Sequence, residues 1–238
     1  MNEQATLGNL LNQTVEEIRE NARAIGIFLA MWIPIGAITT YIDPSSSNAM
    51  GFGFGFMLTE SLMAKGILAV IVVIASTIAG VVLLYWLLAA IVRQTISPGF
   101  DRFWPWFGIY LLSSIGIVFG FLILIVPGII LAIRWVMVLP LVVEADTPAM
   151  DTFGESWNRV RGYSWSILGA ALILFVGVLI ISSVIGGAFA LADQLTSIPG
   201  VIAVAVADGI STVLFIAFPV AVYRLLHNNA DELAEVFE

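Results

Sequence analysis

The chain alternates long apolar runs with short polar segments. Five runs contain no charged residue apart from Asp208 in the last of them: residues 24–42, 66–92, 103–133, 162–192 and 194–223. The hydrocarbon core of a membrane is about 30 Å thick and needs roughly 20 consecutive apolar residues of helix to cross it. Each run is therefore long enough to predict at least one membrane-spanning helix.

The central run is too long for a single span. It reaches residue 143 if Arg134 is tolerated, and at about 1.5 Å per residue a helix over 103–143 would extend roughly 60 Å. Val126-Pro127-Gly128 lies near its middle, where proline removes a helical hydrogen bond and glycine permits a sharp turn. We therefore predict two spans joined by a very tight turn. Six spans result: about 24–42, 66–92, 105–125, 128–144, 165–191 and 199–225.

The basic residues predict how these spans are threaded. If the N-terminus is cytoplasmic, four segments lie inside: residues 1–23, 93–104, 145–164 and 224–238. They carry seven arginines, whereas the outside segments carry only Lys65. This excess follows the positive-inside rule. Both termini are therefore predicted to be cytoplasmic, with residues 24–226 as the transmembrane domain and 227–238 as an acidic tail.

Two of the inside segments are predicted to be amphipathic helices that lie on the membrane surface. In residues 1–23 the apolar side is formed by Leu7, Leu10, Leu11, Val15, Ile18 and Ala22. The other side carries Glu16, Glu17, Arg19 and Glu20. Residues 148–161 repeat this pattern, and such helices either steady a span or dock a partner or lipid. Three tryptophans are expected to anchor the interface: Trp104, Trp157 and Trp165.

Composition narrows the class of protein. Hydrophobic residues make up 60% of the 238 positions and charged residues only 11%, whereas soluble domains carry about 25% charged residues. A water-soluble enzyme is therefore excluded, and the net charge of −8 offers no basic surface for nucleic acid. The chain has no cysteine, a single histidine at position 227 and no catalytic motif. We therefore predict no enzyme activity, no cofactor and no metal site.

Arg134 and Asp208 are charged residues at membrane depth. Because a charge there costs a few kcal/mol, each is a functional candidate. One interpretation is that they neutralise each other as an ion pair, or that Arg134 reaches toward the membrane surface. Another is that Arg134 forms a site for a lipid head group or anion. A midplane site at Arg134 and Asp208 would instead suit a small transporter or lipid translocator.

Small residues are spaced for close helix packing. Gly116 and Gly120 form a GxxxG pair, a spacing that lets helices approach closely in lipid. The pair is expected either to pack helices within the chain or to support self-association.

Residues in the middle of the chain form a pattern that resembles a known bacterial membrane family. The pattern consists of Pro127-Gly128, Arg134 six residues later, Pro140 and Glu144 closing that helix, and Ser156-Trp157 followed by Arg159 and Gly162. It is similar to the membrane domain attached to some glycerophosphodiester phosphodiesterases and to stand-alone inner-membrane relatives. The resemblance covers about residues 120–170 and departs at Glu155, where a basic residue is expected. It implies a membrane domain without the catalytic domain.

These observations predict an all-α polytopic protein of the bacterial inner (plasma) membrane, with six transmembrane helices plus amphipathic interfacial helices. The leading function is non-enzymatic, a membrane-homeostasis or scaffold role that involves contact with membrane lipids, a membrane-protein partner or a second copy. An accessory subunit of a membrane complex is a further alternative. Glu144 is expected to lie within reach of Arg159 or Arg161. The candidate residues for a lipid, anion or ion-pair site are Arg134, Asp208, Glu144, Arg159 and Arg161.

Overall fold

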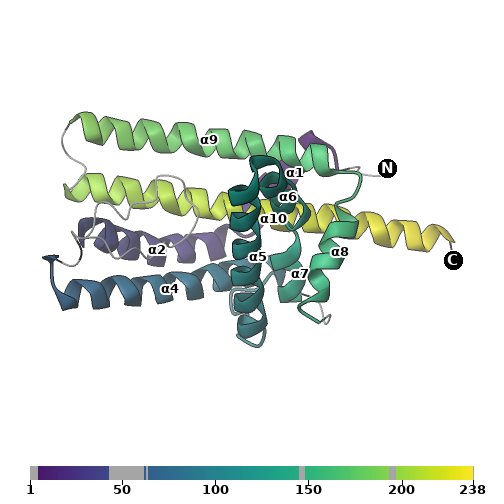
Figure 1. Ribbon diagram of the computed structural model, residues 1–238, viewed down its shortest axis with the longest axis horizontal. Coiled ribbons are helices and arrows are strands. Elements are labelled where there is room, and N and C mark those ends of the chain that lie inside the picture. The colour runs from purple at the N-terminus through teal and green to yellow at the C-terminus, as the bar shows by residue number, and fades with distance from the viewer. Residues whose placement is uncertain (1–4, 43–61, 63, 145–147, 193–196, 238) are drawn as a thin grey trace. The chain divides into compact units, whose positions relative to one another are not determined.

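The computed structural model of the protein describes residues 5–42, 62, 64–144, 148–192 and 197–237. Throughout these residues the regular elements are helices (Figure 1). The helices are α1 (Leu7–Glu20), α2 (Ala22–Ile42), α4 (Ile67–Val92), α5 (Phe103–Ile123), α6 (Ile125–Arg134), α7 (Val138–Glu144), α8 (Asp151–Arg159), α9 (Ser164–Leu191) and α10 (Ile198–Phe237). The predicted all-α class is confirmed.

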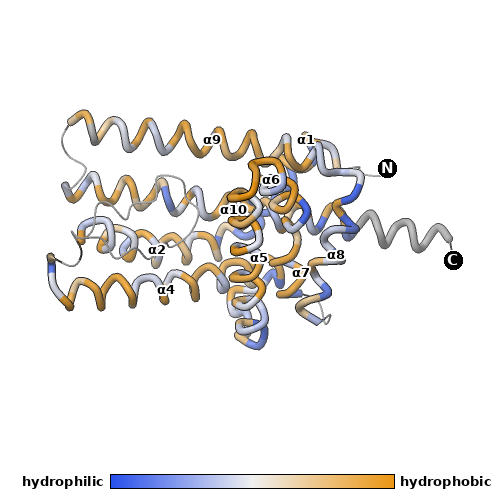
Figure 2. The backbone as a smooth tube through the Cα atoms, viewed as in Figure 1, coloured by the Kyte–Doolittle hydropathy of each residue, from blue (hydrophilic) through white to orange (hydrophobic). Residues whose placement is uncertain are grey.

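Six stretches of helix in the described residues are long and apolar enough to cross a membrane. They are Ala22–Ile42, Ile67–Val92, Phe103–Ile123, Ile125–Glu144, Ser164–Phe189 and Ile198–His227. The fourth stretch combines α6 and α7. Figure 2 shows the contrast along the backbone, with the long helices mostly hydrophobic and many of the hydrophilic residues in α1, α8 and the segment between α4 and α5.

The chain divides into two compact units. The first consists of Met1–Asn21, Leu88–Ile173 and Ile216–Glu238, and the second of Ala22–Leu87 and Leu174–Phe215. The helices α4, α9 and α10 each contribute residues to both units. The core of the first unit includes Leu10, Ile91, Trp106, Met137, Leu141 and Ile167, all fully buried. The second unit buries Phe28, Trp32 and Tyr85 in the same way.

In the first unit, α5 and α6 form the hairpin, but its corner differs from the prediction. The break falls at Leu124, an extended residue with φ −161° and ψ 150°, and not at Pro127–Gly128. Pro127 lies in the first turn of α6, where its missing N–H breaks no helical hydrogen bond because the first N–H groups of a helix have no partner within it. The prediction placed the turn three residues too late because it treated this proline as a helix breaker.

The glycines of the hairpin allow its two helices to touch. A Cβ atom on Gly120 would lie 2.9 Å from the Cα of Gly128, and one on Gly116 would lie 2.5 Å from the ring of Trp135. Both distances are shorter than any real contact of a Cβ atom. The predicted GxxxG pair therefore packs within the chain.

In the second unit, α2 and α10 approach each other through small residues as well. A Cβ atom on Gly36 would lie 3.3 Å from the Cβ of Ala205, and one on Gly209 would lie 2.8 Å from Leu29. The indole of Trp32 lies in this contact. Past the end of the predicted span, α10 continues as helix to Phe237, so the backbone of residues 227–237 is helical where a tail was expected.

Candidate functional site

Two hydrogen bonds, one from Ser156 and one from Arg134, join the ends of α6 and α8. The Ser156 Oγ donates to the backbone carbonyl of Arg134 at 2.7 Å, and the Arg134 Nη1 donates to the carbonyl of Trp157 at 3.1 Å. Both carbonyls belong to the last turns of their helices, where no partner is available within the helix. The arginine and the Ser-Trp pair of the sequence pattern therefore contact each other, and each closes the helix that carries the other.

The Arg134 guanidinium also lies over the ring of Trp157, with its carbon 5.1 Å from the ring centroid. This is within the range of a cation–π contact. Trp157 is 40% exposed, and no ion pair joins Arg134 to a carboxylate in the part of the chain that the structure describes. Arg134 thus presents a positive charge on an exposed aromatic ring, held in place by the helix ends.

Arg159 bridges α8 and α10. Its Nη2 pairs with Glu155, one turn earlier on α8, at 2.6 Å, and its Nη1 lies 3.1 Å from the Nδ1 of His227. The His227 ring stacks on Tyr223 with centroids 5.4 Å apart. Because arginine can only donate, Nδ1 of His227 is the unprotonated nitrogen in this contact. Glu155, which departs from the family pattern, is therefore the residue that neutralises Arg159.

Glu144 was expected to lie within reach of Arg159 or Arg161. Among the described residues it forms no ion pair with either, and the proximity itself stays a prediction. Arg159 is already paired with Glu155 on its own helix, and Glu144 lies beside Tyr223. Arg161 is exposed just past the end of α8.

Arg134 and Asp208 each have a contact within their own unit. Arg134 contacts Trp157 in the first unit. In the second unit, Asp208 Oδ2 accepts a hydrogen bond from Trp32 Nε1 at 3.0 Å. Asp208 thus has a hydrogen-bond donor within its own unit, and the predicted ion pair with Arg134 stays a prediction.

Two of the three predicted anchors are largely exposed. Trp104 is 74% and Trp165 is 85% exposed. The third predicted anchor, Trp157, is partly covered by Arg134. Large exposed rings at helix ends are typical of membrane interfaces. The anchoring role itself stays a prediction.

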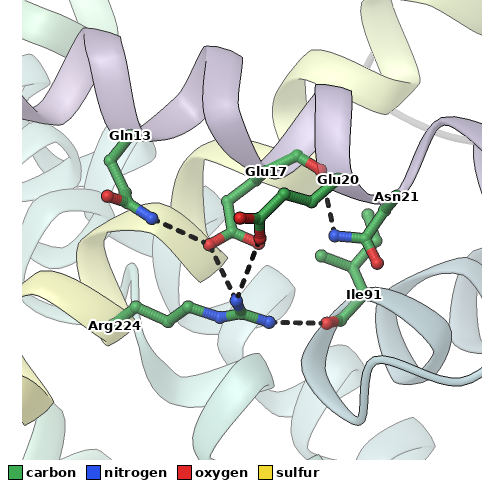
Figure 3. A network of polar contacts seen from close by, with 6 residues as sticks. All are labelled: Gln13, Glu17, Glu20, Asn21, Ile91 and Arg224. Atoms are coloured by element: carbon green, nitrogen blue, oxygen red, sulfur yellow. Dashed lines mark hydrogen bonds and ion pairs between the residues drawn. The ribbon is translucent and has the colours of Figure 1, made fainter.

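The sequence analysis missed an ion pair between α1 and α10. Arg224 Nη1 lies 3.2 Å from Glu17 Oε1 and 3.9 Å from Glu20 Oε2, while Arg224 Nη2 donates to the carbonyl of Ile91 at 2.8 Å (Figure 3). Gln13 also donates to Glu17 Oε1, at 3.1 Å. One guanidinium thus connects the N-terminal helix, the C-terminal end of α4 and the last span.

Glu17 is completely buried, which corrects the predicted orientation of α1. The buried face of α1 consists of Leu10, Thr14 and Glu17, so Glu17 is separated from Glu16, Arg19 and Glu20, with which it was predicted to share the polar side. A detectable signal was present, because residues 10, 14 and 17 follow the spacing of one helix face. It was overlooked because a glutamate was assumed to belong to the water-facing side.

The surroundings of Glu17 shift its proton affinity in two directions. Burial raises the pKa of Glu17, and the positive charge of Arg224 and the hydrogen bond from Gln13 act against this rise. In the described residues no donor reaches the second oxygen, Oε2. The carboxyl is therefore only partly compensated.

The end of α4 completes this junction. Gln94 follows α4 in a left-handed conformation with φ 48°, and Thr95 N donates to Ala90 O at 3.1 Å while Gln94 N donates to Ile91 O at 3.3 Å. This is the hydrogen-bond pattern of a Schellman cap. With its amide oxygen toward Arg224, the Gln94 side chain accepts from Nη1 at 2.6 Å and Nη2 at 3.1 Å.

Arg93, which follows α4, hydrogen-bonds to the C-terminal end of α7. Arg93 forms two hydrogen bonds with Asp101, at 2.8 and 2.9 Å, and its Nη2 also donates to the carbonyl of Val143 at 3.1 Å. The hydrogen bond from Arg93 lowers the pKa of Asp101 to about 2. Arg93 is therefore neutralised locally, unlike Arg134.

The chemistry available in these contacts is electrostatic. The described residues contain no group of three His, Cys, Asp or Glu side chains that could hold a metal ion. Arg93, Arg134 and Arg224 each donate to a carbonyl at a helix end, and Arg134 in addition offers a positive charge beside an exposed ring. Binding of an anionic group is the chemistry that this arrangement supports.

Comparison with known proteins identifies one related family. The sequence model of the membrane domain of glycerophosphoryl diester phosphodiesterase matches residues 107–231, more than half of the chain. The match contains Arg134, Ser156-Trp157, Arg159 and Arg224, but not α1, α2 or α4. No curated protein and no solved structure matches the chain.

Proposed function

Because this multi-pass membrane protein belongs to the family of the membrane domain of glycerophosphoryl diester phosphodiesterase, we propose that it has a non-enzymatic role in membrane homeostasis or as a scaffold. The proposed activity is recognition of anionic phospholipid head groups at the surface that carries Arg134 and Trp157. We place it in the bacterial inner membrane with both termini in the cytoplasm. The excess of arginines in the segments assigned to the inside supports this orientation.

The arrangement of Arg134 supports this proposal above all. Its guanidinium is held by a hydrogen bond to Trp157 O and by the Trp157 ring, and these contacts leave its charge without a carboxylate partner in the described residues. Arginine binds phosphate through a planar set of donors. Trp157 would lie at head-group depth, where an indole is favoured. Arg161 is exposed shortly after α8 and adds a second positive charge.

The transporter alternative requires Arg134 and Asp208 to form one midplane site. Arg134 contacts Trp157 and Asp208 contacts Trp32, and neither contact by itself supports a shared site. We therefore retain head-group recognition as the proposed function.

The lipids that co-purify with the protein test this function. We expect native mass spectrometry to detect anionic phospholipid on the wild type and much less on Arg134→Gln. Glutamine removes the charge and the guanidinium plane, but α8 should remain in place because Ser156 still donates to the backbone carbonyl of residue 134. Arg134→Lys should retain part of the lipid because it keeps the charge without the planar donors.

Arg19→Gln is the matched control, since Arg19 is exposed on α1, far along the chain from this surface. It should leave the bound lipid unchanged. Equal lipid on wild type and Arg134→Gln would contradict head-group recognition. A protein that co-purifies with the wild type and is lost on Arg134→Gln would point to an accessory-subunit role instead.

A further inference from the structure

The helix α1 has three sectors with different surroundings. The first faces the protein and contains Leu10, Thr14 and Glu17, which are buried. At about 100° per residue, a second sector lies roughly a quarter-turn away. It is apolar and consists of Leu7, Leu11, Val15 and Ile18. Leu7 is 38% and Val15 is 49% exposed, and the other two are partly exposed.

The third sector of α1 is polar and exposed. It contains Asn12, Glu16, Arg19 and Glu20. The helix α1 thus has one sector against the protein, an apolar sector beside it and a polar sector on the remaining side. This arrangement fits a position between protein, lipid and water. An interfacial helix on a bare membrane needs only two sectors, apolar and polar.

The position of Leu7 shows what lies next to the apolar sector. A Cβ atom on Gly169 of α9 would lie 2.8 Å from Leu7 Cδ1, so the two residues are in close contact. By helix spacing, Trp165, Leu172 and Ile173 share the Gly169 face of α9. They are 85%, 56% and 49% exposed. Leu7 therefore touches the exposed apolar face of a helix that is apolar enough to cross the membrane.

From this continuity we propose that the apolar sector of α1, formed by Leu7, Leu11, Val15 and Ile18, is a lipid-contact surface covered by phospholipid acyl chains. The helix is fixed to the protein by its buried sector, where Glu17 pairs with Arg224 (Figure 3). It meets lipid with its apolar side. A water-soluble amphipathic helix buries its apolar side in the protein, whereas the buried sector of α1 combines Leu10 with the polar residues Thr14 and Glu17.

The charges on α1 indicate which interaction holds the helix to the lipid. Its exposed polar sector carries Glu16 and Glu20 against Arg19, so it offers no excess of positive charge to anionic head groups. Contact through the apolar sector should therefore not depend on anionic lipid. This separates the surface from the one around Arg134, whose proposed ligand is anionic.

The absence of cysteine from the chain allows each sector to be labelled singly. Val15→Cys, Asn12→Cys and Leu10→Cys place one thiol in the apolar, polar and buried sectors. The Val15→Cys and Asn12→Cys variants would be labelled with an environment-sensitive fluorophore and then reconstituted in vesicles of phosphatidylcholine with or without brominated acyl chains. The Leu10→Cys variant would be reconstituted first and then exposed to the same label. The label on Val15→Cys should lose most of its emission in brominated vesicles. The label on Asn12→Cys should keep most of its emission and respond to aqueous iodide.

Leu10→Cys should resist labelling until the protein is unfolded, which would show that α1 is docked. Adding anionic phospholipid to the vesicles should leave the quenching at Val15→Cys unchanged. Equal quenching at Val15→Cys and Asn12→Cys would overturn the proposal. A Val15→Cys disulfide between two chains would overturn it as well, because it would show that a second copy covers the apolar sector.

Discussion

Glu17 in the first helix and Arg224 near the end of the last span form an ion pair of 3.2 Å, although they lie near opposite ends of the chain (Figure 3). Glu17 is completely buried and Arg224 is mostly buried, with 21% of its side chain exposed. Arg224 also donates to the carbonyl of Ile91 at the end of α4. The pair therefore holds three separate segments of the first unit together.

Replacing Arg224 with alanine is expected to destabilise the protein by about 3 kcal/mol, because it leaves a buried carboxylate without its counter-charge. Glu17→Gln should cost less, since glutamine is neutral and can still accept from Gln13. Chemical unfolding in detergent, followed by tryptophan fluorescence, measures both effects. Arg23→Ala, at an exposed arginine, is the control and should change stability little. Equal effects of the Arg224 and Arg23 variants would contradict the structural role of the pair.

The stability contributed by Glu17 should depend on pH in a defined direction. Burial raises its pKa above the ordinary value of 4.5. The folded protein therefore binds a proton at Glu17 more tightly than the unfolded chain does. The free energy of unfolding gained from this proton is complete below pH 4.5 and is lost as the pH rises through the raised pKa of the folded protein. Arg224 opposes the rise, so Arg224→Ala should make the loss larger, and Glu17→Gln should remove this pH step. Thermal unfolding across a pH series, followed by circular dichroism, would show no such difference between the variants if Glu17 were exposed to water.

The positions of the apolar helices along the chain were largely predictable because the energetic cost of charge in a membrane restricts where charged residues occur. The five apolar runs, with the central one extended past Arg134 and divided near Pro127, predicted all six apolar helices, with ends within a few residues of those in the structure. The hairpin corner was less predictable. Pro127 is a strong signal, but a proline is compatible with the first turn of a helix, and nothing in the sequence distinguishes Leu124 from its apolar neighbours.

The candidate contacts were harder to predict because their partners are distant in the chain. Arg134 was singled out by its position in an apolar run, but its contact with Ser156 and Trp157 depends on where α8 lies. Glu155 neutralises Arg159 through helix spacing alone, which the sequence does contain. Glu17 required knowledge that Arg224 lies opposite, and spacing along α1 can indicate only which side chains share a face.

Gly120→Ala is expected to open the hairpin between α5 and α6. The added Cβ would lie 2.9 Å from the Cα and 3.1 Å from the N of Gly128, and these are backbone atoms that cannot turn away as a side chain can. Such overpacking costs about 1–3 kcal/mol. Gly154→Ala is the control, because a Cβ there meets nothing within 4 Å, and alanine in a helix gains up to about 1 kcal/mol over glycine. A lower melting temperature for both variants would indicate a general intolerance of substitution and not a close approach at Gly120.

Gln94 combines an unfavourable backbone with a favourable side-chain contact, and two variants separate the two effects. Its φ of 48° costs a residue with a Cβ roughly 1 kcal/mol relative to glycine, while a hydrogen bond to a charged group contributes about 1.5–3 kcal/mol. Gln94→Ala loses the contact with Arg224 and keeps the backbone cost, whereas Gln94→Gly loses the contact and removes that cost. Chemical unfolding should therefore rank wild type above Gln94→Gly and Gln94→Gly above Gln94→Ala. If Gln94→Gly proves more stable than wild type, the side chain of Gln94 does not support Arg224 in the way that its position indicates.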